Sequence, residues 1–157
     1  MGRLRTFLLS SILLVIVLIA VIIYNQNKPY TAIIYNQLNK PYTAIINSNW
    51  SIKLPKSYKT IYSTDSGASF NGDGKRYHVF EYRNKEDVNL SLRWEDGTNE
   101  SIESAINVTL NEMHITKENM PDFKEKYRHY IIQKDFSEID LIFVPGTKRL
   151  YVIENIQ

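Results

Sequence analysis

Histidine is the side chain most often used for acid/base chemistry and for metal binding near neutral pH. The chain has three, His78, His114 and His129, and no two of them lie at a metal-ligand spacing. It has no cysteine, which excludes a thiolate metal site, a thiol nucleophile, a disulfide and a lipoprotein attachment through a thiol. We therefore expect no metal site and no cofactor, and histidines that lie at the surface or are partly buried.

Hydroxyl and carboxyl groups are present, but not in the sequence contexts that activate them. The serines between residues 57 and 69 stand in neither a G-x-S-x-G nor an S-x-x-K motif. Two carboxylates that converge on a substrate cannot be recognised from sequence alone. No catalytic residue is assigned, and whether the protein is an enzyme stays open.

A glycine-bearing stretch, "STDSGASFNGDGKR", spans residues 63–76. Its Asn-Gly and Asp-Gly pairs are strong turn signals. Its oxygen-bearing side chains lack the spacing and the distal glutamate of a calcium loop, and no phosphate-binding Lys-Ser/Thr follows the glycines. Binding residues concentrate on loops that a rigid scaffold holds, so this stretch is a candidate interaction loop. Its candidate residues are Asp65, Asn71, Asp73, Lys75 and Arg76.

The first elements that must position this loop are strands. In "NWSIKLPKSYKTIY" the alternation of Trp50, Ile52 and Leu54 with polar residues predicts a strand that Pro55 ends. "RYHVFEYR" (76–83) is rich in aromatic and β-branched residues, and "VNLSLRW" (88–94) alternates apolar with polar residues. Both patterns predict further strands.

The apolar period changes to that of a helix from about Asn99. Asn99 is the predicted N-cap, and Glu100 and Glu103 place negative charge at the positive end of the helix dipole. The apolar face carries Ile102, Ala105, Ile106, Leu110 and Met113. This spacing predicts an amphipathic helix.

The last third of the chain returns to strands after a polar break around Pro121. The stretches "YRHYIIQ" (127–133), "IDLIFV" (139–144) and "RLYVIENI" (149–156) predict three strands, with a Pro-Gly turn between the last two. The order predicts an α+β domain over residues 50–157. We expect an antiparallel sheet with one main amphipathic helix packed on one face, because such a sheet can leave its other face wet.

The N-terminal part predicts a membrane anchor. Residues 7–24, "FLLSSILLVIVLIAVIIY", carry no charge and as a helix would span roughly 27 Å, close to the thickness of the bilayer core. The run is longer than the apolar part of a signal peptide and no A-x-A pattern follows it, which favours an uncleaved anchor over a cleavable signal. Arg3 and Arg5, in the n-region of residues 1–6, predict a cytoplasmic N-terminus and an extracytoplasmic C-terminal domain.

A tandem duplication follows the anchor. "IIYNQNKPYTA" (22–32) recurs as "IIYNQLNKPYTA" (33–44), with Leu38 as the only addition. Two such short units cannot bury a shared core, so they predict a juxtamembrane stalk over residues 25–49 that the duplication has lengthened. Alternatively, the paired isoleucines of the repeats add a strand to the domain.

Charge argues against nucleic acid as a partner. Removing the two N-terminal arginines from 19 basic residues leaves 17, against 17 acidic ones, so the exported part is neutral. No basic patch stands out along the chain. The partners expected are therefore the membrane and an envelope protein.

Two resemblances accompany these patterns. The basic start, apolar run, Ile/Lys/Asn/Tyr-rich domain and lack of cysteine make the chain similar in composition to small membrane-anchored envelope proteins of Gram-positive bacteria with AT-rich genomes. The phrase "WSIKLPKSY" (50–58), with the order of strands, helix and meander, resembles the Mog1/PsbP-like group of small α+β domains. Neither resemblance carries over a functional residue.

The expected function is that of a single-pass membrane protein with a non-catalytic extracytoplasmic binding domain. The first alternative is a membrane-tethered hydrolase whose acid/base pair comes from scattered Asp, Glu or His residues. The second is an immunity or stress-response protein that acts within the membrane plane.

Overall fold

The computed structural model of the chain describes Val17, Ile19 and residues 41–67 and 73–157. The chain divides into two compact units, Met1–Pro41 and Tyr42–Gln157, and the second is the domain treated below. The predicted anchor and most of the predicted stalk lie outside the described residues, apart from Val17 and Ile19, which are helical. Within the described part, no helix is both long and apolar enough to cross a membrane.

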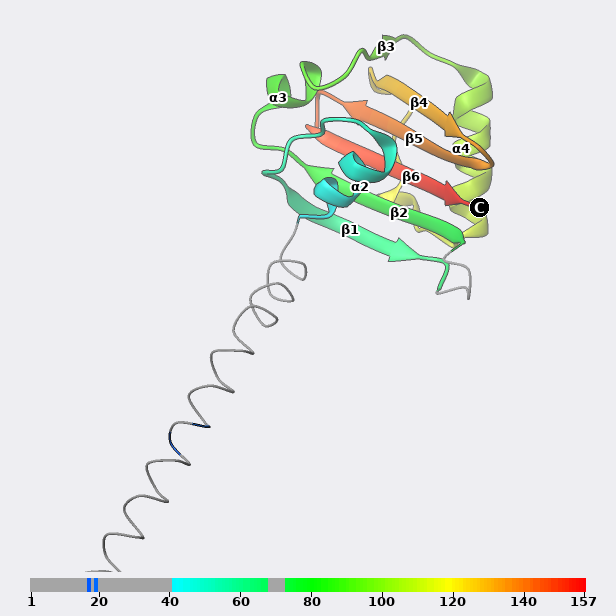
Figure 1. Ribbon diagram of the computed structural model, residues 1–157. Coiled ribbons are helices and arrows are strands. Elements are labelled where there is room, and N and C mark those ends of the chain that lie inside the picture. The colour runs from blue at the N-terminus through cyan, green and yellow to red at the C-terminus, as the bar shows by residue number, and fades with distance from the viewer. Residues whose placement is uncertain (1–16, 18, 20–40, 68–72) are drawn as a thin grey trace, which may run out of the picture. The chain divides into compact units, whose positions relative to one another are not determined.

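The domain is α+β and its centre is one antiparallel sheet of six strands, in the order β1-β2-β6-β5-β4-β3 (Figure 1). The strands are β1 (Lys59–Asp65), β2 (Gly74–Glu81), β3 (Glu95–Asp96), β4 (Arg128–Lys134), β5 (Ser137–Val144) and β6 (Arg149–Ile156). The helices are α2 (Tyr42–Trp50), α3 (Lys85–Asn89), α4 (Glu100–Glu112) and the short 3₁₀ helix η1 (Lys117–Asn119). The predicted strands over 76–83, 127–133, 139–144 and 149–156 are confirmed.

Two tight connections build the C-terminal meander. Asp135 and Phe136 join β4 to β5, and Asp135 takes a left-handed backbone conformation with φ 55°. Pro145 begins the four-residue turn from β5 to β6, as predicted, and Lys148 ends it with φ 58°. The last strand then lies between β5 and β2, so strands from both ends of the domain meet at the middle of the sheet.

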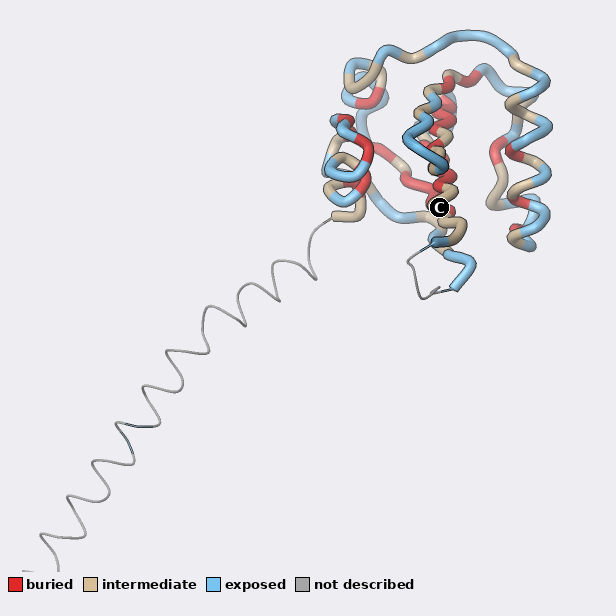
Figure 2. Tube along the Cα trace, turned by 45° about the vertical axis from the view of Figure 1, so that its right-hand side comes forward, coloured by how far each residue is buried: buried red, intermediate tan, exposed pale blue. Residues whose placement is uncertain are grey.

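Both faces of the sheet are covered. One hydrophobic cluster joins Ile106 and Leu110 of α4 to side chains of β2, β5 and β6, and a second joins Ile46 of α2 and Val88 of α3 to the opposite sides of the same strands. Figure 2 shows the buried strands between these helical layers. The expected helix on one face is confirmed, but the expected wet second face is wrong. The physical reason is that the central strands carry apolar residues at consecutive positions, which must be buried in both directions.

The predicted helix forms with both of its ends capped. The Asn99 side chain accepts a hydrogen bond from the Ile102 backbone N–H at 3.2 Å, as expected of an N-cap. At the other end His114 adopts φ 57°, and the N–H of Ile115 donates to the Leu110 carbonyl at 2.9 Å. This pattern is a Schellman motif, which ends the helix and turns the chain.

The strand predicted for Trp50, Ile52 and Leu54 is wrong. These residues are buried and alternate with exposed ones, but Trp50 ends α2 and the next residues form no ladder. The Asn47 side chain binds both the N–H and the carbonyl of Leu54, at 2.7 and 2.9 Å, and holds an irregular segment across the sheet. The apolar residues of this segment therefore alternate with polar ones because alternate side chains are buried, although the segment pairs with no strand.

The folded unit begins at Tyr42, eight residues before the boundary expected at Trp50. α2 belongs to the domain, because Thr43 and Ile46 are fully buried. The stalk expected over 25–49 thus ends in a helix that packs on the sheet.

The strand predicted for 88–94 is also wrong. Asn84 caps α3 by accepting from the Glu86 N–H, and Val88 alone of the helix is buried. The Trp94 indole N–H donates to the Val88 carbonyl at 2.8 Å, which folds the chain back on itself. Leu90 is 86% exposed, and only Glu95 and Asp96 pair as strand β3, with His129 and Arg128.

Leu110→Ala tests the α4 layer. Leu110 is fully buried, so the variant should lose about 2–5 kcal/mol of unfolding free energy through lost burial and a residual cavity. Chemical denaturation with circular dichroism measures it. Val108→Ala on the same helix is the control, since Val108 is 54% exposed and its loss should change stability by less than about 0.5 kcal/mol. Equal effects of the two changes would contradict this packing.

Candidate functional site

The candidate interaction loop is described only at its two stems, and Asn71 lies outside the described residues. Asp65 and Arg76 face each other in the β1–β2 register. Lys75 forms an ion pair with Glu112 of α4, and Asp73 is exposed directly before β2. The structure therefore uses one of the five predicted residues to hold α4 to the sheet and brings two of them together.

The structure reveals a serine-histidine pair that the sequence did not. Ser63 and His78 are opposite in the β1–β2 register, and the serine Oγ lies 2.8 Å from His78 Nδ1. His78 is 6% exposed, and its Nε2 has no hydrogen-bond partner among the described residues. Burial, and then the nearby Arg76 charge, lower the pKa of His78 to about 4. A hydrolytic triad needs a carboxylate on the second ring nitrogen, and here that nitrogen is unpartnered.

A buried carboxylate lies on the same side of the sheet. Glu154 of β6 is 1% exposed and accepts from the Tyr42 hydroxyl at 2.8 Å and from the Trp50 indole at 2.7 Å. The Tyr42 ring also contacts His78, with ring centroids 3.9 Å apart. Burial and the Glu154 charge raise the pKa of Tyr42 above its ordinary range, so the hydroxyl stays a donor. These contacts attach α2 to the sheet.

A pair of acidic groups, Asp140 and Glu138 of β5, lies on the α4 side of the sheet. Asp140 follows the alternation of β5 and lies opposite Ile131 and Ile153 in its two neighbouring strands. Burial, together with the charge and hydrogen bond of Glu138, raises the pKa of Asp140 to about 7. The sequence signal was available, because Asp140 stands at an inward position within "EIDLIFV".

The other two histidines do not meet either pair. His129 of β4 is 6% exposed, and its Nε2 lies 3.2 Å from the Glu95 carboxylate on β3. His114 is exposed at the end of α4. Two histidines are thus more buried than expected. Over residues 41–67 and 73–157, no group of three His, Asp or Glu side chains is placed to hold a metal ion.

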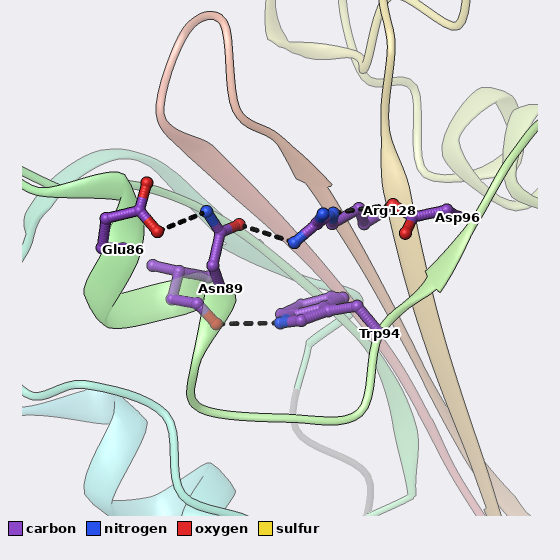
Figure 3. A network of polar contacts seen from close by, with 6 residues as sticks. Glu86, Asn89, Trp94, Asp96 and Arg128 are labelled. Carbon is purple, nitrogen blue, oxygen red and sulfur yellow. Dashed lines mark hydrogen bonds and ion pairs between the residues drawn. The ribbon is translucent and has the colours of Figure 1, made fainter.

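Arg128 organises the sheet edge where β3 ends. Figure 3 shows its guanidinium between Asn89 and Asp96. Its Nε donates to Asp96 at 2.7 Å and its Nη1 to the Asn89 side chain at 3.1 Å. The Asn89 amide in turn donates to Glu86 at 3.3 Å. Arg128 of β4 is therefore joined to β3 and to α3 by one hydrogen bond each.

Two adjoining surface hollows flank this network. The larger, of about 430 Å³, is lined by Asp96, Glu125, Lys126, Tyr127, Arg128, Pro145 and Gly146. The second, of about 310 Å³, shares four of those residues and adds Gly97, Thr98, Phe123 and Lys124. We call the two together the β3 groove.

The floor of the β3 groove is fixed by hydrogen bonds. The Tyr127 hydroxyl accepts from the Asn99 N–H at 2.8 Å and donates to Glu103 at 2.7 Å. Tyr127 is 4% exposed, and Phe123 packs edge-on against its ring. Lys124, Glu125 and Lys126 are exposed above this floor. The groove thus offers charges of both signs over a hydrogen-bonded aromatic base. The hydrophobic periodicity of the sequence did not predict it.

Comparison of the chain with protein-family models, with curated proteins and with solved structures finds no match. The resemblances to Gram-positive envelope proteins and to the Mog1/PsbP-like group therefore stay expectations from the sequence.

Asp140→Asn tests the half-buried Asp140 carboxyl. The folded state holds the Asp140 proton up to a pH of about 7, whereas the unfolded chain releases it near its ordinary value of 3.8. Wild-type stability should therefore fall as pH rises from about 4 to about 7, and the variant should escape this loss. We expect the variant to be more stable by roughly 1–3 kcal/mol at pH 8 and nearly unchanged at pH 4.

Urea unfolding across that pH range measures the difference. Asp73→Asn, at an exposed position, serves as the control and should show a difference that does not vary with pH. An equally flat difference for Asp140→Asn would contradict the raised pKa of the Asp140 carboxyl.

Proposed function

We propose that the chain is a single-pass membrane-anchored protein whose Tyr42–Gln157 domain is a non-catalytic extracytoplasmic binding module. The observation that carries the binding part is the β3 groove. Its deeper polar groups, Arg128 and Tyr127, already bind other side chains, whereas its lysines and Glu125 are exposed. A site built in this way recognises a partner and has no poised nucleophile or base.

The chemistry of the groove favours a polypeptide segment as partner. Charges of both signs, an aromatic floor and backbone at Gly97 and Gly146 suit a chain with mixed side chains better than a polyanion. The Glu125 carboxylate lies over Gly146, where an added Cβ would come within 3.0 Å of its Oε2. An envelope protein therefore fits this site better than a nucleic acid does.

The membrane part of the proposal rests on the sequence of residues 1–24. An uncharged run of 18 residues after two arginines favours insertion with the N-terminus in the cytoplasm. The domain would then face the exterior, and it contains no cysteine that could form a disulfide there.

The membrane proposal predicts the behaviour of the full-length protein in bacterial cells. It should sediment with membranes, and protease added to spheroplasts should digest the C-terminal domain while a cytoplasmic marker survives. Replacing Arg3 and Arg5 with Glu should leave a larger fraction of the C-terminal domain undigested, because the charge bias that sets the orientation is reversed. Recovery of the intact protein from the cytosol would contradict the anchor.

The groove proposal predicts a charge-specific loss of binding. Lys124→Glu with Lys126→Glu should reduce crosslinked capture of an envelope protein at least about tenfold, because it reverses the exposed positive charge of the groove. Lys53→Glu with Lys56→Glu makes the same charge change at exposed positions outside the groove and should leave capture unchanged.

Quantitative crosslinking in intact membranes measures both variants. If Asp65→Lys with Asp73→Lys abolished capture while the groove variant retained it, binding would belong to the glycine-bearing loop instead. The hydrolase alternative has one observation in its favour, the Ser63–His78 contact. It would require Ser63→Ala to abolish a hydrolytic activity of the purified protein.

A further inference from the structure

α2 occupies a specific site on the sheet. The residues that face the sheet are Tyr42, Thr43, Ile46 and Trp50, of which Thr43 and Ile46 are completely buried. Tyr42 and Trp50 both donate to Glu154. The side chains between them, Ile45, Ser48 and Asn49, face solvent. The site therefore accommodates a tyrosine, a threonine, an isoleucine and a large apolar residue at fixed helical spacing.

The first repeat carries the same pattern twelve residues earlier. Residues 27–34, "NKPYTAII", are identical to residues 39–46, so Tyr30, Thr31 and Ile34 stand where Tyr42, Thr43 and Ile46 do. The offset of 12 also puts Leu38 at the position of Trp50, since 38 and 50 differ by the same number. The one residue added in the second repeat unit thus completes the sheet-facing pattern of the first.

Two differences explain why the second copy is the one that docks. Leu38 lacks the indole N–H that Trp50 donates to Glu154. Tyr35 stands in place of Asn47, whose side chain makes two hydrogen bonds with the Leu54 backbone. The first copy keeps the buried isoleucine and the tyrosine donor, and loses three hydrogen bonds.

We propose that residues 30–38 are a second occupant of the α2 site, and that the chain can exchange Tyr42–Trp50 for them within one molecule. In the exchanged state Tyr30 donates to Glu154, Ile34 fills the place of Ile46 and Leu38 that of Trp50. Residues 39–51 then form a loop before Ile52, and closing a loop of this length has a modest entropic cost. The covalent link between the two copies favours exchange within a chain over exchange between chains.

The exchange would change the length of chain between the N-terminal run and the domain. In the observed arrangement residues 25–41 connect residue 24 to the docked helix, and after exchange residues 25–29 do so. The difference of twelve residues corresponds to at most about 40 Å of extended chain. That this distance separates a domain from a membrane rests on the proposed function, whereas the exchange itself does not.

The test disables the native occupant and asks whether the first copy replaces it. Ile46→Asp puts a charge at a fully buried position. In a single-copy chain lacking residues 30–41, which joins Pro29 to Tyr42 and keeps the local sequence, this change should lower the melting temperature by more than about 15 °C. In the full-length, two-copy protein in detergent the shift should be at most about half as large, because copy one docks instead.

Adding Ile34→Asp to the two-copy Ile46→Asp chain should restore the full loss. Ile45→Asp is the matched control, since Ile45 is 41% exposed, and should have a small and equal effect in both chains. Acrylamide quenching should show one of the two tryptophans becoming accessible in two-copy Ile46→Asp, because Trp50 leaves the sheet.

Three results would overturn the proposal. The first is an equal drop in melting temperature for Ile46→Asp in the one-copy and two-copy chains, and the second is no further drop when Ile34→Asp is added to two-copy Ile46→Asp. The third is a smaller drop in the two-copy chain only at protein concentrations at which dimers form. The last would assign the first copy to exchange between chains. None of these results bears on fractionation or capture, so failure here is distinct from failure of the proposed function.

Discussion

The buried Glu154 carboxylate is the group on which one whole side of the domain depends. A charge removed from water needs hydrogen-bond donors, because its burial is otherwise strongly unfavourable. Tyr42 and Trp50 supply those donors from one face of a helix, eight residues and about two turns apart. Arg76 stands opposite Glu154 on the neighbouring strand. The helix is otherwise short and rich in polar residues, so this polar attachment and the buried Ile46 give it a defined place.

That attachment has a consequence for where a partner can bind. Because α2 and α3 cover one face of the sheet and α4 covers the other, neither broad face is free within the described residues. The accessible features are therefore the loops and the two sheet edges, one at β1 and the other where β3 pairs with β4. The Arg128 contacts link this second edge to α3, and the β3 groove lies directly beside it. The position of the groove follows from how the sheet buries its faces.

The sequence predicted the elements whose signals are local. Asn99 followed by an apolar helical stripe predicted α4, and dense β-branched runs predicted β5 and β6. The failures are at Trp50–Leu54 and at 88–94, where alternating apolar residues are buried without strand pairing. There the deciding contacts are a side-chain bridge from Asn47 to Leu54 and an indole bond from Trp94 to Val88. Such contacts depend on the folded context, as do the Ser63–His78 pair and the β3 groove, which join residues that are distant in sequence.

The position of β6 bears on how the domain is made. β6, the last of the six strands along the chain, lies in the middle of the sheet, hydrogen-bonded to β2 on one side and to β5 on the other. The pair β1–β2 and the group β3–β4–β5 cannot join until β6 is present, and the pairing of β6 with β2 joins residues far apart along the chain. A nascent chain would therefore keep an incomplete sheet until β6 has been synthesised. The complete sheet would then form in one late step, after the other five strands have been made.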